Sequence, residues 1–225
     1  MKGRLFGVGV GPGDPELMTL KAVRLIKEND IIAVPGADVR ETVAYKIAVQ
    51  AVPELADKEL LPIYMPMTHD KAELELNHEK GAKALEAALD TGKNVVFLTL
   101  GDPTIYSTYM YIHRIVKAKG YETTIISGIP SFCAAAARMD DSLVDRAEEL
   151  HVIPSSYGIE AALNYSGTKI LMKSASGISE VKRTLEEKAG KVNVKMIENC
   201  GMPEERIYER IEDVPEQAGY YSLLI

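Results

Sequence analysis

The sequence predicts an α/β fold in two domains, with a mainly parallel sheet in the first and a mixed sheet in the second. In the first half of the chain, strand patterns alternate with helix patterns, which is typical of parallel sheets covered by helices on both faces. Near the end, two strand patterns at 206–211 and 220–225 follow each other closely and favour antiparallel pairing. A Ser-Gly-Ile-Pro loop at 127–130 separates the two regions. We therefore predict domains at 1–128 and 129–225.

The predicted strands of the first domain are short, mostly apolar segments that end one or two residues before a glycine or a proline. These strands cover 5–10, 31–34, 60–64, 95–100 and 122–126. Helices are expected between them, from Pro15 to before Asp30 and over 42–51, 70–90 and 105–117. Asp14 is suited to cap the first helix, and Pro15 is suited to its first turn. Gly92 is suited to end the helix expected at 70–90.

The second domain begins with a predicted helix of small residues at 131–139. Strand patterns at 151–153, 169–173 and 192–198 then alternate with helices before the final pair of strands.

Composition limits the class of protein. The chain has 225 residues and a net charge of −7, which disfavours a nucleic-acid-binding surface. No apolar run reaches the ~18 residues of a membrane span, and the N-terminus lacks a signal-peptide pattern, so we expect a cytoplasmic protein. Cys133 and Cys200 lie far apart and the four histidines are scattered, so we expect reduced thiols and no bound metal.

A glycine-rich loop from Gly7 to Asp14 (GVGVGPGD) lies where the first strand passes into the first helix. Glycines let a backbone approach a ligand closely, and a helix N-terminus offers free amide groups. The dinucleotide pattern GxGxxG fails because Pro12 and Asp14 stand where glycine is needed, and no Gly-Lys-Ser or Gly-Lys-Thr follows. Two interpretations stay open, a ligand-binding loop and a tight turn with Asp14 as a cap.

Further motifs follow buried strands. Residues 98–107 (LTLGDPTIYS) put a Gly-Asp-Pro turn at the carboxyl end of a strand, where open parallel sheets bind ligands. Asp102 is suited either to accept from a ribose or amino group or to cap the next helix. The small residues of 127–137 (SGIPSFCAAAA) permit close approach either to a ligand or only to the sheet. Weaker signals lie at 171–173 and 198–203.

These motifs follow one another in a fixed order over essentially the whole chain, and in this order they resemble the tetrapyrrole methylase family. Residues 98–108, Pro66-Met67-Thr68 and 201–207 (GMPEERI) most resemble the enzymes that methylate carbon 20 of precorrin-2 or of its cobalt counterpart, cobalt-factor II. The resemblance implies two α/β domains with the active site in the trough between them. It also implies S-adenosylmethionine (SAM) as methyl donor, a tetrapyrrole substrate and a homodimer.

The resemblance further implies a set of residues that bind SAM and names no catalytic side chain. The implied cofactor-binding residues are Pro12, Gly101, Asp102, Pro103, Ile105, Ser131, Phe132, Met172 and Cys200. Candidates for a general base, by their position in loops alone, are Asp14, Asp102, His69 and Tyr106. Hypotheses for binding the carboxylates of the substrate are Arg40 and Lys173.

Other functions stay open at this point. One is a sibling enzyme that methylates another carbon of the ring, including uroporphyrinogen methylation for sirohaem. A second is a methylase of the same fold acting on another substrate, as in the diphthamide pathway, which the carbon-20-like stretches disfavour. A third is a non-catalytic phosphate-binding module, which the missing lysine after the glycine loop disfavours. The sequence does not decide whether the substrate holds cobalt.

Overall fold

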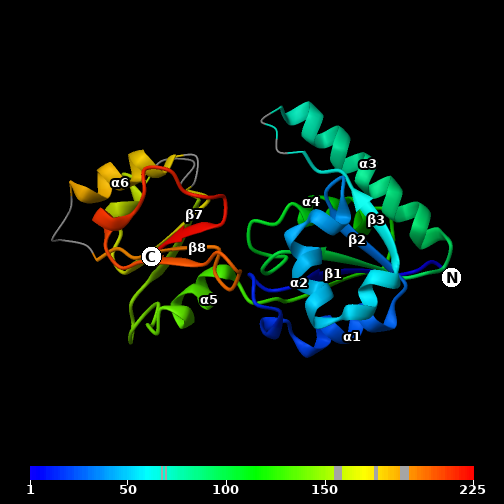
Figure 1. The fold of residues 1–225 in the computed structure, drawn as a ribbon. Coiled ribbons are helices and arrows are strands. Elements are labelled where there is room, and N and C mark those ends of the chain that lie inside the picture. Colours follow the sequence, from blue (N-terminus) through cyan, green and yellow to red (C-terminus); the bar gives the residue numbers. More distant parts are fainter. Residues whose placement is uncertain (67, 69, 155–158, 175–176, 188–192) are drawn as a thin grey trace. The chain divides into compact units, whose positions relative to one another are not determined.

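The computed structural model describes residues 1–66, 68, 70–154, 159–174, 177–187 and 193–225. The chain forms two units, Met1–Pro130 and Ser131–Ile225, which Figure 1 draws in blue to green and in green to red. Each unit has its own sheet.

A parallel sheet forms the centre of the first unit. Among the described residues it has five strands in the order β3-β2-β4-β1-β5, all paired in parallel. Their bounds are β1 Leu5–Gly9, β2 Ile31–Pro35, β3 Glu59–Ile63, β4 Val95–Thr99 and β5 Thr123–Ile126. The central strand β4 is buried at every residue, as its unbroken apolar run requires when helices cover both faces. The predicted parallel sheet is confirmed.

Helices cover both faces of this sheet. In the described part of the first unit they are α1 Leu20–Glu28, α2 Val43–Ala51, α3 Lys71–Asp90 and α4 Tyr109–Ala118. The connections from β1 to β2 and from β2 to β3 run in one direction along the sheet and carry α1 and α2. The other two run in the opposite direction and carry α3 and α4. Because such connections are right-handed, the two pairs lie on opposite faces (Figure 1).

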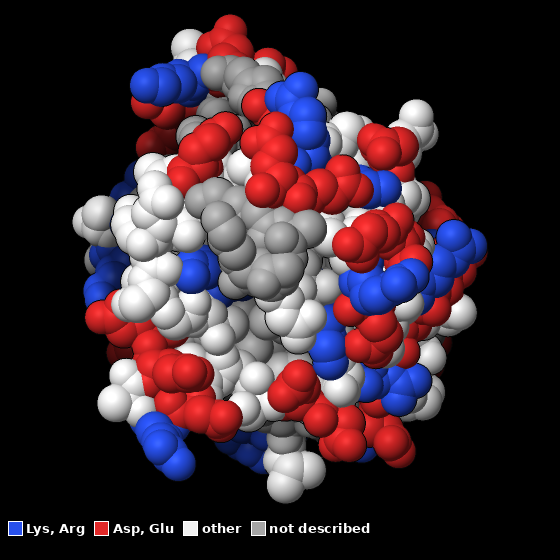
Figure 2. All heavy atoms as spheres, turned by 90° about the vertical axis from the view of Figure 1, so that its left-hand side faces the viewer, with Lys and Arg blue, Asp and Glu red and all other residues white. Residues whose placement is uncertain are grey.

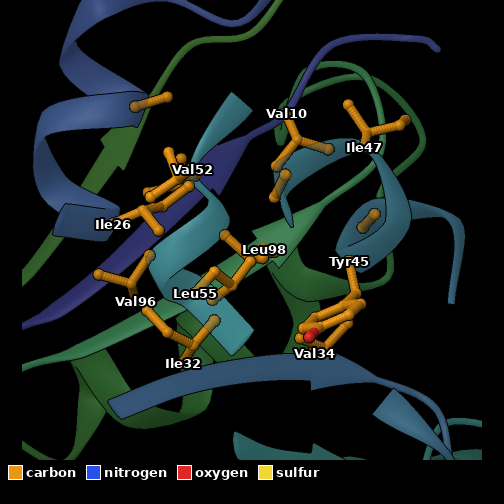
Figure 3. Close-up of a cluster of buried hydrophobic side chains, with 14 of the residues drawn as sticks. Val10, Ile26, Ile32, Val34, Tyr45, Ile47, Val52, Leu55, Val96 and Leu98 are labelled. Carbon is orange, nitrogen blue, oxygen red and sulfur yellow. The ribbon is translucent and has the colours of Figure 1, made fainter. Parts of the chain in front are cut away.

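Alternate side chains along β4 point into two different hydrophobic cores, one on each face of the sheet. On β4, Val96 and Leu98 point into the cluster with α1 and α2, which Figure 3 shows with Ile26 of α1 and Tyr45 of α2. Their neighbour Phe97 packs on the opposite face with α3 and α4. Burial of each such side chain contributes about 1.5–3 kcal/mol to the free energy of folding. The two cores therefore fix the ends of the strands, from which the loops of the candidate site extend.

The first helix begins later than predicted. Asp14 caps only a short 3₁₀ turn, Pro15–Leu17, by accepting a hydrogen bond from the N–H of Glu16 at 2.8 Å. The α-helix itself begins at Leu20, where the Thr19 hydroxyl accepts the N–H of Ala22 at 3.2 Å. Asp14 is thus a cap, as predicted, but of a 3₁₀ turn, and the choice between a ligand-binding loop and a simple turn stays a prediction.

A mixed sheet forms the second unit. In the described residues its strand order is β6-β7-β10-β8-β9. The bounds are β6 Leu150–Pro154, β7 Thr168–Met172, β8 Met196–Glu198, β9 Arg206–Tyr208 and β10 Ser222–Leu224, with helices α5 Ser131–Arg138 and α6 Ile178–Glu186. The expected antiparallel pairing is present, but β9 and β10 do not pair with each other, because each lies against β8. The strand predicted from 192 begins at Met196, and residue 192 itself lies outside the described residues.

Candidate functional site

The loops after β1, β4 and β5 pack directly on one another at the carboxyl edge of the first unit's sheet. The backbones of Gly11 and Gly101 form an antiparallel bridge, in which the Gly101 N–H donates to the Gly11 carbonyl at 2.8 Å. The N–H of Val10 donates to the carbonyl of Thr99 at 3.0 Å. Because ligands of open α/β sheets bind beyond this edge, the loops form the candidate site of the first unit.

Two glycines make this packing possible. A Cβ atom at Gly9 would lie 2.4 Å from the carbonyl oxygen of Gly101, and one at Gly128 would lie 2.1 Å from the same oxygen. No real Cβ tolerates such a distance to a backbone atom, so any side chain at either position forces the loops apart. The glycine-rich loop is thus used to bring three backbones together at one place.

The carboxylate of Asp102 holds two of these loops in register. The residue is buried, and its Oδ1 accepts the N–H of Thr104 at 2.8 Å and the Thr104 hydroxyl at 2.5 Å. Its Oδ2 accepts the N–H of Gly128 at 3.0 Å. Asp102 therefore stabilises its own turn and the loop after β5, which is a backbone role and gives no support to a role as general base.

The rest of the Gly-Asp-Pro turn lies in a longer loop than predicted. Pro103 of this turn is buried, and Ile105 is half-buried. Pro12, in the glycine-rich loop, is also buried. The helix predicted from Ile105 begins only at Tyr109, because Tyr106 has φ +49°, which interrupts a helix. The Ser107 hydroxyl lies 2.9 Å from the Thr99 hydroxyl and so ties the loop back to the end of β4.

In the second unit, Met172 and Cys200 come to one edge of the sheet. Met172 ends β7, and Cys200 follows the end of β8 by two residues. Both strands run antiparallel to β10, so they run parallel to each other and their carboxyl ends lie at the same edge. Both side chains are half-buried.

Ser131 and Phe132 open α5. Phe132 is buried and Ser131 is half-buried. On β7, Leu171 packs with α6, so the next residue, Met172, points to the other face. Figure 1 shows α5 and α6 on opposite sides of this sheet, so Met172 and α5 share a side.

Left-handed backbone conformations accompany the predicted residues. Five described residues other than glycine have positive φ, and three of them are direct sequence neighbours of a predicted cofactor-binding residue. These three are Tyr106, Lys173 and Asn199, with φ of 49°, 59° and 51°. Such conformations persist only where surrounding contacts enforce them, and they concentrate at ligand sites.

The other residues suggested as a general base or as partners of the substrate carboxylates gain no support from the structure. His69 lies outside the described residues, and Asp14 is engaged as the cap of the 3₁₀ turn. Arg40 is exposed and donates to the carbonyl of Ala56 at 3.3 Å, while Lys173 is exposed at the end of β7. Figure 2 shows acidic and basic side chains intermixed on one face. Among the described residues, no three His, Cys, Asp or Glu side chains gather as metal ligands, and no helix could cross a membrane.

The sequence assigned no role to Glu198, the last residue of β8. Its side chain is buried, with Oε1 accepting the N–H of Gly219 at 2.8 Å and Oε2 accepting the Tyr208 hydroxyl at 2.9 Å. Tyr208 has a raised pKa, first because of burial and then because of this bond to Glu198. The sequence signal that could have revealed this role of Glu198 is a charged residue at the end of an otherwise apolar strand.

Comparison with known proteins agrees with this geometry. A sequence model of the family "Tetrapyrrole (Corrin/Porphyrin) Methylases" matches residues 4–215. The chain belongs to this family. It is 37% identical over 171 residues to the probable cobalt-precorrin-2 C(20)-methyltransferase of Methanocaldococcus jannaschii, covering 76% of this chain and 72% of the relative.

Two further relatives of this tetrapyrrole methylase cover nearly the whole chain. The precorrin-2 C(20)-methyltransferase of a Sinorhizobium species is 27% identical, over 99% of this chain and 94% of its own. The uroporphyrin-III C-methyltransferase of Thermus thermophilus, solved in complex with S-adenyl homocysteine, superposes with a TM-score of 0.69 over 99% of this chain and 96% of its own, at 20% identity. The structural match shows that the two proteins share a fold.

Proposed function

We propose that this tetrapyrrole methylase transfers a methyl group from SAM to carbon 20 of cobalt-factor II or precorrin-2 in cobalamin biosynthesis. The observation that carries the proposal is the 37% identity to the cobalt-precorrin-2 C(20)-methyltransferase of M. jannaschii. It is supported by the 27% identity, over nearly the whole chain, to an enzyme named for precorrin-2 itself. A homodimer and a cytoplasmic location are part of the proposal, and sedimentation of the purified protein tests the first.

The residues proposed to bind SAM occupy two places, which are the interlocked loops of the first unit and, within the second unit, the start of α5 with the β7 and β8 edge. The glycine packing of Gly9, Gly101 and Gly128 leaves backbone groups, and no bulky side chain, at the first of these places. Pro12, Pro103 and Ile105 would add apolar contacts to a bound nucleoside there. Within the second unit, Phe132 and Met172 are the apolar side chains of the proposed set.

Methyl transfer from SAM depends more on how the protein positions the two substrates than on reactive side chains. When bound, SAM supplies a methyl group made electrophilic by its sulfonium. The chain's task is to hold an electron-rich carbon of the tetrapyrrole in line with that group, and such positioning is worth about 7–11 kcal/mol in favourable systems. A strong counter-anion beside the sulfonium would stabilise the ground state and slow the transfer, because the positive charge is lost on the way to the transition state. The two oxygens of Asp102 are directed to the protein itself, since they accept hydrogen bonds from the N–H groups of Thr104 and Gly128.

The alternative is a sibling methyltransferase that acts at another ring carbon, including uroporphyrinogen methylation for sirohaem. The fold does not separate the two, because the T. thermophilus uroporphyrin-III enzyme shares it at 20% identity. The alternative has no relative among those described above whose identity reaches that of the carbon-20 enzyme.

The test is anaerobic incubation of the purified protein with SAM and, separately, cobalt-factor II, precorrin-2 and uroporphyrinogen III. We expect the product of one of the first two to gain the mass of a single methyl group, with no gain when SAM is omitted. A gain with cobalt-factor II alone places the enzyme in a route with early cobalt insertion. A gain with uroporphyrinogen III alone favours the sibling function.

A further inference from the structure

A tight turn follows β8 and contains Cys200. Asn199 and Gly201, on either side of the thiol, both have positive φ, of 51° and 74°. The turn closes by a hydrogen bond from the N–H of Met202 to the carbonyl of Asn199 at 2.8 Å. The left-handed conformation of Asn199, a residue other than glycine, needs contacts from its surroundings to hold it.

Glu205 supplies such contacts through both of its carboxylate oxygens. Oε2 accepts the N–H of Gly201, inside the turn, at 2.7 Å. Oε1 accepts the Nε–H of Arg138 at 2.6 Å. The Glu205 side chain is only 15% exposed, so water screens these bonds less than those of an ordinary surface pair.

Arg138 is the last residue of α5, the helix that begins with Ser131 and Phe132. Glu205 therefore links two segments that sequence resemblance assigns separately to the cofactor, the start of α5 and the Cys200 turn. The adjacent Glu204 differs, because its side chain is exposed and only its backbone carbonyl is used, as acceptor for Asn199 at 3.3 Å. Of the two glutamates in GMPEERI, one is thus tied to the turn.

We propose that Glu205 is a positioning residue for methyl-donor binding, which fixes the Cys200 turn against α5 without touching the reacting atoms. The inference rests on the proposed function. In Glu205→Gln, one oxygen becomes an NH₂ group that faces a donor, either the N–H of Gly201 or the Nε–H of Arg138. One of the two links must break, and the turn loses its fixed relation to the helix.

The experiment measures binding of S-adenosylhomocysteine by calorimetry to the full-length wild type, Glu205→Gln and the matched control Glu204→Gln. We expect Glu205→Gln to raise the Kd about 10-fold, the loss typical of one hydrogen bond to a charged group, and Glu204→Gln to leave it unchanged. Steady-state kinetics should show a higher KM for SAM with kcat and the KM of the tetrapyrrole little altered, a split that general destabilisation would not produce.

Unchanged binding by a folded Glu205→Gln overturns the inference while leaving the proposed function standing. If Glu205→Gln does not fold, Arg138→Ala takes its place. That variant keeps the bond to Gly201, so a smaller rise in Kd is expected and no rise overturns the inference. A wild type that binds neither SAM nor S-adenosylhomocysteine contradicts the proposed function itself.

Discussion

The Oδ2 atom of Asp102 accepts the backbone N–H of Gly128 at 3.0 Å and so joins the loop after β4 to the loop after β5. The two residues are 26 positions apart in the chain, with α4 and β5 between them. This bond fixes the spacing of two loops that would both line the proposed SAM site. It also gives the acidic residue of this turn a structural role that requires no proton transfer.

Replacing Asp102 by asparagine should destabilise the protein. The amide keeps an acceptor for Thr104 but turns an NH₂ group toward the N–H of Gly128, which leaves a partly buried donor without its partner. We expect a loss of about 1–3 kcal/mol in the free energy of unfolding, measured by urea denaturation. The matched control is Asp14→Asn, because asparagine caps a helical turn as well as aspartate does. Equal stability of the two variants would contradict the role given to Asp102.

A methyl group at Gly128 should separate the interlocked loops. The added Cβ would lie 2.1 Å from the carbonyl oxygen of Gly101, so the backbone must move. We expect Gly128→Ala to lose about 1–3 kcal/mol of stability and to bind SAM more weakly. Gly177→Ala is the control, since a Cβ there meets no atom within 4 Å. If Gly128→Ala melts and binds like the control, the loops are not packed as described.

Stability should depend on the protonation of His113. Burial, and secondarily the charges of Lys117 and Arg114, lower the pKa of its imidazole below the ordinary 6.5. Its Nδ1 lies 2.9 Å from the Tyr109 hydroxyl, whose own pKa is raised by burial, so a hydrogen bond joins the neutral imidazole to a neutral phenol. The unfolded chain then binds more protons below pH 6.5, and the free energy of unfolding falls as the pH decreases from 6.5 through the folded pKa.

Unfolding curves over that pH range check this dependence. His113→Asn removes the titrating ring, so its stability should fall less steeply with decreasing pH than that of the wild type. The pKa of His78 is also lowered by burial, and His78→Asn provides the comparison at a second position. Identical slopes for the wild type and His113→Asn would rule out the contribution of His113.

Ile105 is proposed to contact the nucleoside of SAM, and its truncation should weaken binding. Ile105→Ala removes part of an apolar contact, worth roughly 1 kcal/mol or about 5-fold in Kd. Leu76→Ala is the control, because Leu76 is an exposed leucine of α3, a helix that carries none of the proposed contacts. Calorimetry with S-adenosylhomocysteine distinguishes them, and equal affinities would remove Ile105 from the site.

Local patterns predicted the strands of the first unit well, because a buried parallel strand such as β4 is an unbroken apolar run between polar residues. Helix starts were predicted less well. The segment from Ile105 to Thr108 has a helical pattern, but the left-handed Tyr106 and the Ser107–Thr99 contact hold it as a loop. That outcome depends on a partner eight residues away, which periodicity does not report.

The prediction of the site residues depends on the order of the motifs and their resemblance to a family, and less on the chemistry of single side chains. Spacing alone left the glycine loop open, because the reason for Gly9 and Gly128 is a contact with Gly101 across three strands. The role of Glu205 was beyond sequence reasoning, since it depends on Arg138, 67 residues earlier. Likewise, the closeness of β9 and β10 in sequence did not reveal that both pair with β8.

The position of the transferred methyl group tests the central claim most directly. We would incubate the protein anaerobically with SAM labelled with ¹³C at the methyl carbon and with cobalt-factor II or precorrin-2, then record the ¹³C NMR spectrum of the product. The account predicts one enriched methyl signal, at the chemical shift of a methyl group bonded to the meso carbon 20. Label on a pyrrole-ring carbon, or incorporation into uroporphyrinogen III only, would contradict it.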